Sequence, residues 1–89
     1  MKDRLVIKYA PHFFRKLKKL ELDLQEEVFE KLESFADTQN HKSLKVHKLK
    51  GDISGLYSFF VNYKIRIVFS YLSKDEVVLL VVGGHDMYK

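Results

Sequence analysis

The residues best suited to chemistry stand at the ends of apolar segments in the second half of the chain: His47, Arg66, His85 and Tyr88. His47 precedes the first of these segments, Arg66 interrupts the apolar run 65–69, and His85 follows two glycines. If the segments form an antiparallel meander, their ends can meet. Imidazole, guanidinium and phenol groups can move protons and stabilise a crowded phosphate, which is the chemistry of metal-free RNA cleavage.

Such cleavage needs a base for the 2′-hydroxyl, a cation for the phosphate oxygens and an acid for the departing 5′-oxygen. Histidine suits the base, because its ordinary pKa is about 6.5. Arginine holds phosphate with a planar fork and keeps its charge. Plainer interpretations stand beside these: His47 and His85 as solvated loop histidines, Arg66 on the wet face of a strand, and Tyr88 as an anchor for the tail rather than a base-stacking group or proton donor.

Charge is unevenly distributed along the chain. Residues 1–20 hold seven basic and one acidic side chain, whereas residues 21–37 hold one basic and seven acidic ones. We interpret these as neighbouring helices whose surface charges offset each other. Residues 38–66 hold six basic side chains and one acidic one, with no such local partner, so this cluster is the better candidate for RNA contact. Its candidate RNA-binding residues are Lys45, Lys48, Lys50 and Lys64.

The composition fits one small domain spanning residues 1–89, with 46% hydrophobic residues for a modest core. The chain has no cysteine, which excludes thiolate metal sites and fits a cytoplasmic protein. No apolar run approaches the ~20 residues of a membrane span. The four histidines show no metal-ligand spacing, so we expect neither a metal nor a cofactor.

Periodicity predicts a strand over 4–9, a helix from Pro11 to about residue 20, and a second helix starting at an Asp23 cap. Strand-like segments follow at 56–61, 65–72 and 77–82, separated by short turns. The last is apolar on both faces, which predicts a central strand covered on both sides. The fold class is therefore α+β: an N-terminal strand, a helical hairpin, then a three-stranded antiparallel meander.

Five segments, in this order and spacing, resemble the RelE/ParE superfamily, the toxins of bacterial and archaeal toxin–antitoxin modules. They are residues 9–20, 47–51, 55–59, 63–69 and 82–88, so the resemblance spans essentially the whole chain. It implies a helical hairpin packed on a mainly antiparallel sheet with a concave basic groove. In the ribosome-dependent endoribonuclease branches, mRNA in the ribosomal A site is cut in that groove, and a cognate antitoxin neutralises the toxin.

The resemblance also implies roles for individual residues. His47 stands where the YafQ-like branch carries a catalytic histidine, and Arg66 matches the strand arginine of the RelE-like and YoeB-like branches. His85 matches a position that acts at the leaving group, with Tyr88 near an aromatic position. RelE-like toxins set two lysines where this chain has Ser58 and Phe60, so lysine-based chemistry is not available.

The alternative function is non-enzymatic. The ParE branch shares the fold, inhibits DNA gyrase and lacks a nuclease constellation, and a decayed toxin could persist as an antitoxin-binding module. The combination of His47, Arg66 and His85 favours the nuclease. We expect an acidic, partly disordered antitoxin as the protein partner, since a chain of net charge +4 attracts one.

Overall fold

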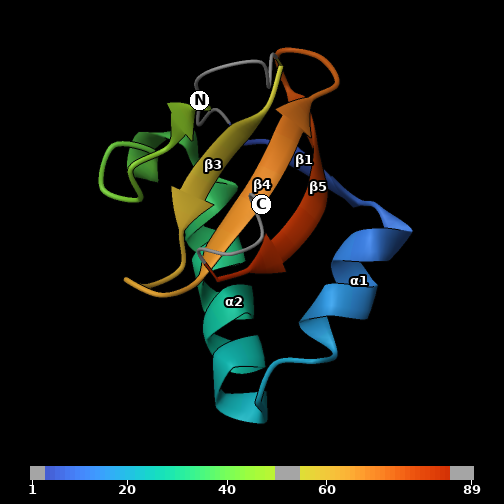
Figure 1. Cartoon of the computed structure of the whole chain (residues 1–89). Coiled ribbons are helices and arrows are strands. Elements are labelled where there is room, and N and C mark those ends of the chain that lie inside the picture. Colours follow the sequence, from blue (N-terminus) through green and yellow to red (C-terminus); the bar gives the residue numbers. More distant parts are fainter. Residues whose placement is uncertain (1–3, 50–54, 85–89) are drawn as a thin grey trace.

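The structure is a computed structural model that describes residues 4–49 and 55–84. Its helices and strands follow the predicted α+β order, with one short strand added before the meander (Figure 1). The elements are β1 (Val6–Tyr9), α1 (Pro11–Leu17), α2 (Leu22–Phe35), a 3-10 helix η1 (Thr38–Asn40), β2 (His47–Lys48), β3 (Tyr57–Phe60), β4 (Arg66–Tyr71) and β5 (Glu76–Gly83).

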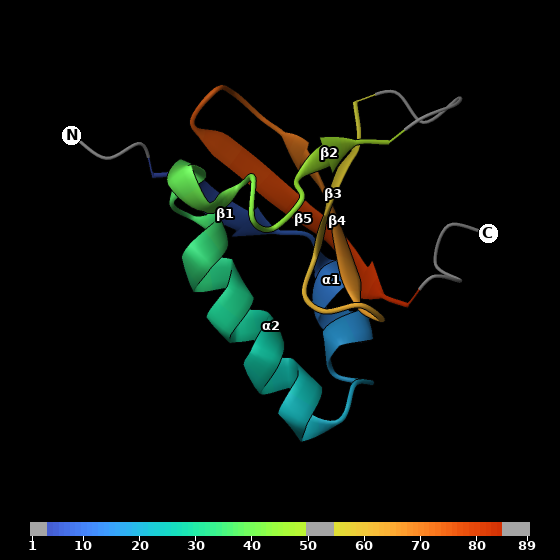
Figure 2. The same cartoon turned by 90° about the vertical axis from the view of Figure 1, so that its left-hand side faces the viewer.

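The strands form one mixed sheet in the order β1-β5-β4-β3-β2. The antiparallel meander of β3, β4 and β5 is confirmed, and β1 adds to β5 in parallel. The two-residue strand β2 pairs with β3 at the opposite edge, where Figure 2 shows the two side by side. The predicted central position of the last strand is confirmed, because β5 has a neighbour on each side.

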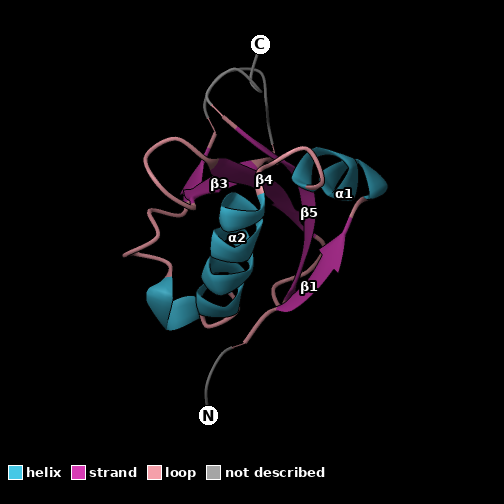
Figure 3. Cartoon of the chain, turned by 90° about the horizontal axis from the view of Figure 1, so that it is seen from below, coloured by secondary structure: helices cyan, strands magenta, loops and turns pink. Residues whose placement is uncertain are grey.

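Both helices contribute to a single core with one face of this sheet. Phe35 of α2 stacks on Phe59 at a centroid distance of 4.3 Å and meets Phe69 edge-on at 4.8 Å. Figure 3 shows α2 lying inside the curve of the sheet. Phe13 of α1 is fully buried in the same core. Side chains alternate along a strand, so the residues between these core positions point to the other side of the sheet.

A β-bulge in β5 keeps its apolar residues aimed at the helices. Val68 pairs with Val81, but the next residue, Phe69, pairs with Leu79. Leu80 is therefore an extra residue in the ladder, and it reverses the alternation beyond it. As a result both Leu79 and Val82 are buried, although they lie three positions apart.

Two sequence-based predictions about these elements are wrong. The strand β5 is not covered equally on both faces, because alternate residues such as Val78 and Val81 are only half-buried. The second helix does not start at an Asp23 cap: Glu21 holds the N-cap position, and its side chain makes no capping hydrogen bond. The backbone amide of Gln25 donates to the carbonyl of Glu21, so the helix begins at Leu22 and Asp23 lies in its first turn. In the first turn, the positive end of the helix dipole still stabilises the negative charge of Asp23.

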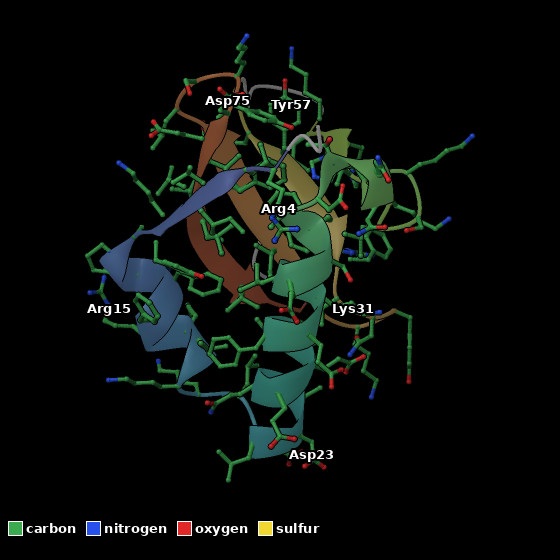
Figure 4. The ribbon with its side chains drawn as sticks, turned by 180° about the vertical axis from the view of Figure 1, so that it is seen from behind. Arg4, Arg15, Asp23, Lys31, Tyr57 and Asp75 are labelled. Carbon is green, nitrogen blue, oxygen red and sulfur yellow. The ribbon has the colours of Figure 1, made fainter. Side chains whose placement is uncertain are left out.

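The basic side chains of α1 do not all face the acidic side chains of α2 (Figure 4). Figure 4 shows Arg15 projecting from α1 away from α2, whereas Asp23 lies at the far end of α2. The Arg15 guanidinium lies 3.5 Å from Nδ1 of His12 on the same helix. Among residues 4–49 and 55–84, no helix is long and apolar enough to span a membrane.

Candidate active site

The sheet brings His47 and Arg66 to the same face through β3, which lies between their strands. His47 of β2 is paired with Ser58, and Arg66 of β4 is paired with Phe60. Ser58 and Phe60 are two positions apart on β3, so all four residues share one face. Since Phe59 faces the helices, this is the opposite side of the sheet. We call it the distal face and define it by His47, Ser58, Phe60, Arg66 and Val68.

Phe60 is the contact that joins the two candidate groups. The guanidinium carbon of Arg66 lies 4.7 Å from the centre of the Phe60 ring. The ring of His47 lies 6.2 Å from the same ring, centre to centre, at an angle of 61°. The imidazole and the guanidinium therefore approach one aromatic ring from two neighbouring strands.

His47 is exposed, and one of its nitrogens is already committed. Its Nδ1 lies 2.7 Å from the carbonyl oxygen of Lys45, which can only accept a hydrogen bond. Nδ1–H must therefore be the donor. In the neutral ring this leaves the lone pair on Nε2, the arrangement required of a histidine that accepts a proton.

The loop before β2 supplies that carbonyl through a left-handed residue. The amide of Lys45 donates to the Lys42 carbonyl and the amide of Val46 donates to the His41 carbonyl, at 3.1 and 3.0 Å. This is a Schellman motif, with Lys45 at φ 59° in the position that usually holds glycine. A left-handed conformation costs a residue with a Cβ roughly 1–2 kcal/mol. The loop thus carries local strain one residue away from Val46 and two from His47.

The side chain of Arg66 is less exposed to solvent than that of His47. It is half-buried, its Nε has no exposed surface, and it occupies the first position of a strand with neighbours on both sides. A guanidinium stays charged at any physiological pH. The ring attracts the charge of the guanidinium, whereas phosphate is bound by its N–H groups, so the contact with Phe60 is compatible with binding an anion.

The turn that leads into Arg66 is organised by Asn62. Its side-chain oxygen accepts hydrogen bonds from the amides of Lys64 and Ile65, both at 2.8 Å. Its side-chain nitrogen donates to Glu27 of α2 at 2.9 Å. The start of β4 is therefore tied to the helix layer, which places Arg66 relative to the rest of the sheet.

The candidate lysines do not all lie with His47. Lys45 and Lys48 are exposed on either side of it, but Lys48 pairs with Tyr57 and so points away from the distal face. Lys64 is exposed in the turn before β4, with its ammonium 5.6 Å from the Tyr63 ring centre. Lys50 lies outside the described residues.

His85 and Tyr88 also lie outside the described residues, so their predicted places in the site stay predictions. The described chain ends close to Arg66. Gly83 is paired with Arg66, and a Cβ on Gly84 would lie 3.7 Å from the carbonyl oxygen of Lys64. The described part of β5 therefore ends beside the turn that leads into Arg66.

Exposure varies across the candidate site: His47 is exposed, whereas Ser58 and Val68 are buried. No pocket is found within the described part of the chain, and no group of three His, Asp or Glu residues there is arranged to hold a metal ion. The concave groove implied by the resemblance stays a prediction.

At the far end of β4, burial raises the pKa of Tyr71 above its usual 10.0, and the nearby Tyr57 raises it further.

Sequence reasoning missed Phe60 as a component of the site. From the sequence, Phe60 was notable only as a departure from the lysine pattern of RelE-like toxins. The available signal was its strand position two residues from Ser58, combined with the short turn that places Arg66 opposite. Register cannot be read from one segment alone, so the contact became visible only once the strands were paired.

Solved structures match this fold over nearly the whole chain. The RelBE2 toxin–antitoxin complex from Mycobacterium tuberculosis aligns with a TM-score of 0.71 at 20% identity, covering 92% of this chain and 99% of the matched chain. The YoeB–YefM complex from Staphylococcus aureus gives 0.69 at 23% identity, over 92% and 98%. The chain has the RelE/YoeB toxin fold.

YafQ from Escherichia coli strain BL21(DE3) has the RelE/YoeB fold at a TM-score of 0.68, although identity is only 13% over 96% of this chain and 98% of that one. Neither a protein-family model nor a curated protein matches the sequence. The likeness is therefore one of architecture, and the predicted fold class is confirmed by it. Within this RelE/YoeB fold, β2, β3 and β4 carry the residues of the distal face.

Proposed function

We propose that this protein is the toxin of a type II toxin–antitoxin system and acts as a ribosome-dependent mRNA endoribonuclease that inhibits translation. One observation carries the proposal: His47 and Arg66 contact the same Phe60 ring on one face of a RelE/YoeB fold. A proton acceptor and a fixed cation within the reach of one ring suit a ribose–phosphate link. The matched RelBE2 and YoeB–YefM structures are toxin–antitoxin complexes, which supports the assignment as a toxin of such a system.

In the proposed reaction, Nε2 of His47 takes the proton of the 2′-hydroxyl. The 2′-oxygen attacks the adjacent phosphorus, and the bond from phosphorus to the 5′-oxygen breaks, leaving a 2′,3′-cyclic phosphate. Arg66 stabilises the charge that builds on the phosphate oxygens. We assign His85 to protonate the 5′-oxygen and Tyr88 to the same end of the site. No metal takes part in this scheme.

The hydrogen bond to Lys45 fits the assignment of His47 as the base. A histidine that starts as the base must be neutral and must present an unprotonated nitrogen to the substrate. Donation from Nδ1 to a carbonyl leaves Nε2 in that state. The sequence alone leaves the roles of His47 and His85 interchangeable.

The substrate would be held in two ways. Lys45, Lys48, Lys50 and Lys64 contribute attraction to the phosphate backbone. The ribosomal A site would pre-position the message, because two side chains provide little orientation by themselves. The protein would accordingly work in the cytoplasm. A cognate antitoxin, acidic and partly disordered when alone, would cover the distal face and fold as it binds.

Primer-extension mapping of mRNA after brief expression tests the proposal. Codon-phased cuts are expected for the unaltered protein and not for Arg66→Ala, which should also relieve growth arrest while still binding antitoxin. Arg15→Ala is the matched control, since Arg15 is exposed on α1. Intact message accompanied by DNA damage would contradict the nuclease and support a gyrase inhibitor. Growth arrest by Arg66→Ala at full strength would show that the site is misassigned.

A further inference from the structure

The position of Phe60 is unusual for an apolar side chain of this sheet. Its neighbour Phe59 is fully buried against Phe35 in the core. Phe60 points to the distal face, is half-buried, and is not among the described residues that form the core or pack against it. Its ring contacts are instead with His47 and Arg66. Core packing therefore does not explain an aromatic residue here.

The contact with Arg66 has a direction that leucine or valine cannot supply. The face of an aromatic ring is electron-rich and attracts a cation placed over it. At 4.7 Å the guanidinium carbon lies within the distance at which this attraction acts. The ring thereby favours one orientation of the planar guanidinium, and orientation determines where its N–H groups can bind phosphate.

The contact with His47 complements the hydrogen bond to Lys45. One bond to Nδ1 still lets an imidazole tilt about the donor. An edge-to-face arrangement with Phe60, at 6.2 Å and 61°, limits that tilt. The ring of His47 is then held by two contacts, one with the Lys45 carbonyl in the loop before β2 and one with Phe60 of β3.

We propose that Phe60 is a positioning residue that fixes the orientation of Arg66 and His47 relative to each other for the cleavage step. This inference rests on the proposed function and deepens it. Catalytic groups displaced by about 1 Å can lose roughly a hundredfold in rate. Phe60 acts through the other two side chains and needs no contact with the reacting atoms.

The test compares Phe60→Leu with Phe60→Tyr, which keeps the aromatic face. Steady-state cleavage of mRNA on purified ribosomes should show a kcat that is roughly 10- to 100-fold lower for Phe60→Leu, with little change in KM. Phe60→Tyr should retain the rate. Phe29→Leu is the matched control, because Phe29 is a 52% exposed phenylalanine on α2, remote from the site.

A second readout needs no RNA. In the free protein, the Nε–H proton of Arg66 should report the ring above it by its NMR shift and by slow exchange with solvent. Phe60→Leu should move that signal and speed its exchange, whereas Phe60→Tyr and Phe29→Leu should not. If Phe60→Leu leaves the signal unchanged, or if it cleaves as fast as the unaltered protein, the positioning role is overturned.

The two readouts separate the two proposals. Absence of cleavage by the unaltered protein would overturn the proposed function and, with it, the kinetic part of the inference. The Arg66 signal would then still decide whether Phe60 orients the guanidinium. Equal loss of kcat in Phe60→Leu and Phe60→Tyr would also count against the inference, because it would point to packing volume and not to the aromatic face.

Discussion

The loops that precede the two candidate groups are held in different ways. The segment 41–46, before His47, turns through Lys45 in a left-handed conformation. The turn 61–65, before Arg66, is tied to α2 by the side chain of Asn62. The first loop carries strain and ends at a two-residue edge strand, whereas the second is relaxed and opens a central strand. Loss of the His47 side chain should therefore alter reactivity, loss of Asn62 should alter stability, and relief of the strain at Lys45 should raise stability slightly.

The largest expected effect comes from His47→Ala. Loss of a general base typically lowers the rate by about 10²- to 10⁴-fold. Because His47 is exposed, the free energy of unfolding should change by no more than about 0.5 kcal/mol. Single-turnover cleavage and denaturant unfolding measure the two quantities. His12→Ala, an exposed histidine on α1, is the control and should cleave normally; cleavage by His47→Ala at the normal rate would remove the base assignment.

Asn62→Ala should show the opposite pattern. It removes three hydrogen bonds that shape the turn, so the free energy of unfolding should fall by about 1–3 kcal/mol. Asn62→Asp keeps the two acceptor bonds but places a second carboxylate against Glu27, so its loss should be smaller but measurable. Chemical denaturation gives both values. Stability equal to that of the unaltered protein in both variants would mean that the turn does not anchor β4.

Lys45→Gly tests the strain in the first loop. Glycine adopts positive φ without a steric penalty, which removes roughly 1–2 kcal/mol of strain, but its freer unfolded chain offsets about 0.5–1 kcal/mol of this. A net gain in unfolding free energy of up to about 1 kcal/mol is expected. Lys42→Gly, in the same loop without a positive φ, should lose about 0.5–1 kcal/mol. Thermal unfolding of the pair is the measurement, and equal losses would contradict the assignment of strain.

The smallest effect is expected at Tyr71, remote from both loops. Burial, with Tyr57 nearby, raises its folded pKa above 10.0, so the native state favours the neutral phenol. The resulting stability is fully present below pH 10.0 and is lost as the pH rises through the folded pKa. Tyr71→Phe should be near neutral at pH 7 and should unfold less readily than the unaltered protein at alkaline pH. A comparison of unfolding midpoints across that range checks the sign.

Much of the fold could be predicted because local periodicity determines it. Phe13 and Leu17 recur at helical spacing, and the segments from Tyr57 onward are rich in strand-forming residues. The misses are non-local or very short. The two residues of β2 are too few to show alternation, and the parallel pairing of β1 with β5 depends on segments far apart in the chain. The Asp23 cap failed because the helix starts after Glu21, whose side chain makes no capping hydrogen bond, so residue type did not mark the start.

The site was less accessible to sequence reasoning. His47 and Arg66 could be proposed from their residue types and from the resemblance, but their common contact with Phe60 depends on the register of two strand pairs. A shift of one residue in either pair would send one of them to the core side of the sheet. The tautomer of His47 depends in turn on the left-handed Lys45, which no sequence rule predicts for a lysine.

The parallel ladder between β1 and β5 has a consequence for biosynthesis. Val6 meets Glu76 and Tyr9 meets Leu79, so the first strand of the described sheet pairs with its last strand in chain order. Such distant pairings form late, after helices and hairpins. Before β5 has been synthesised, the nascent chain lacks the core residues Val77, Leu79 and Val82, and β1 has no strand to pair with. A growing copy should therefore stay inert until translation of β5 is finished and this strand has emerged from the ribosome.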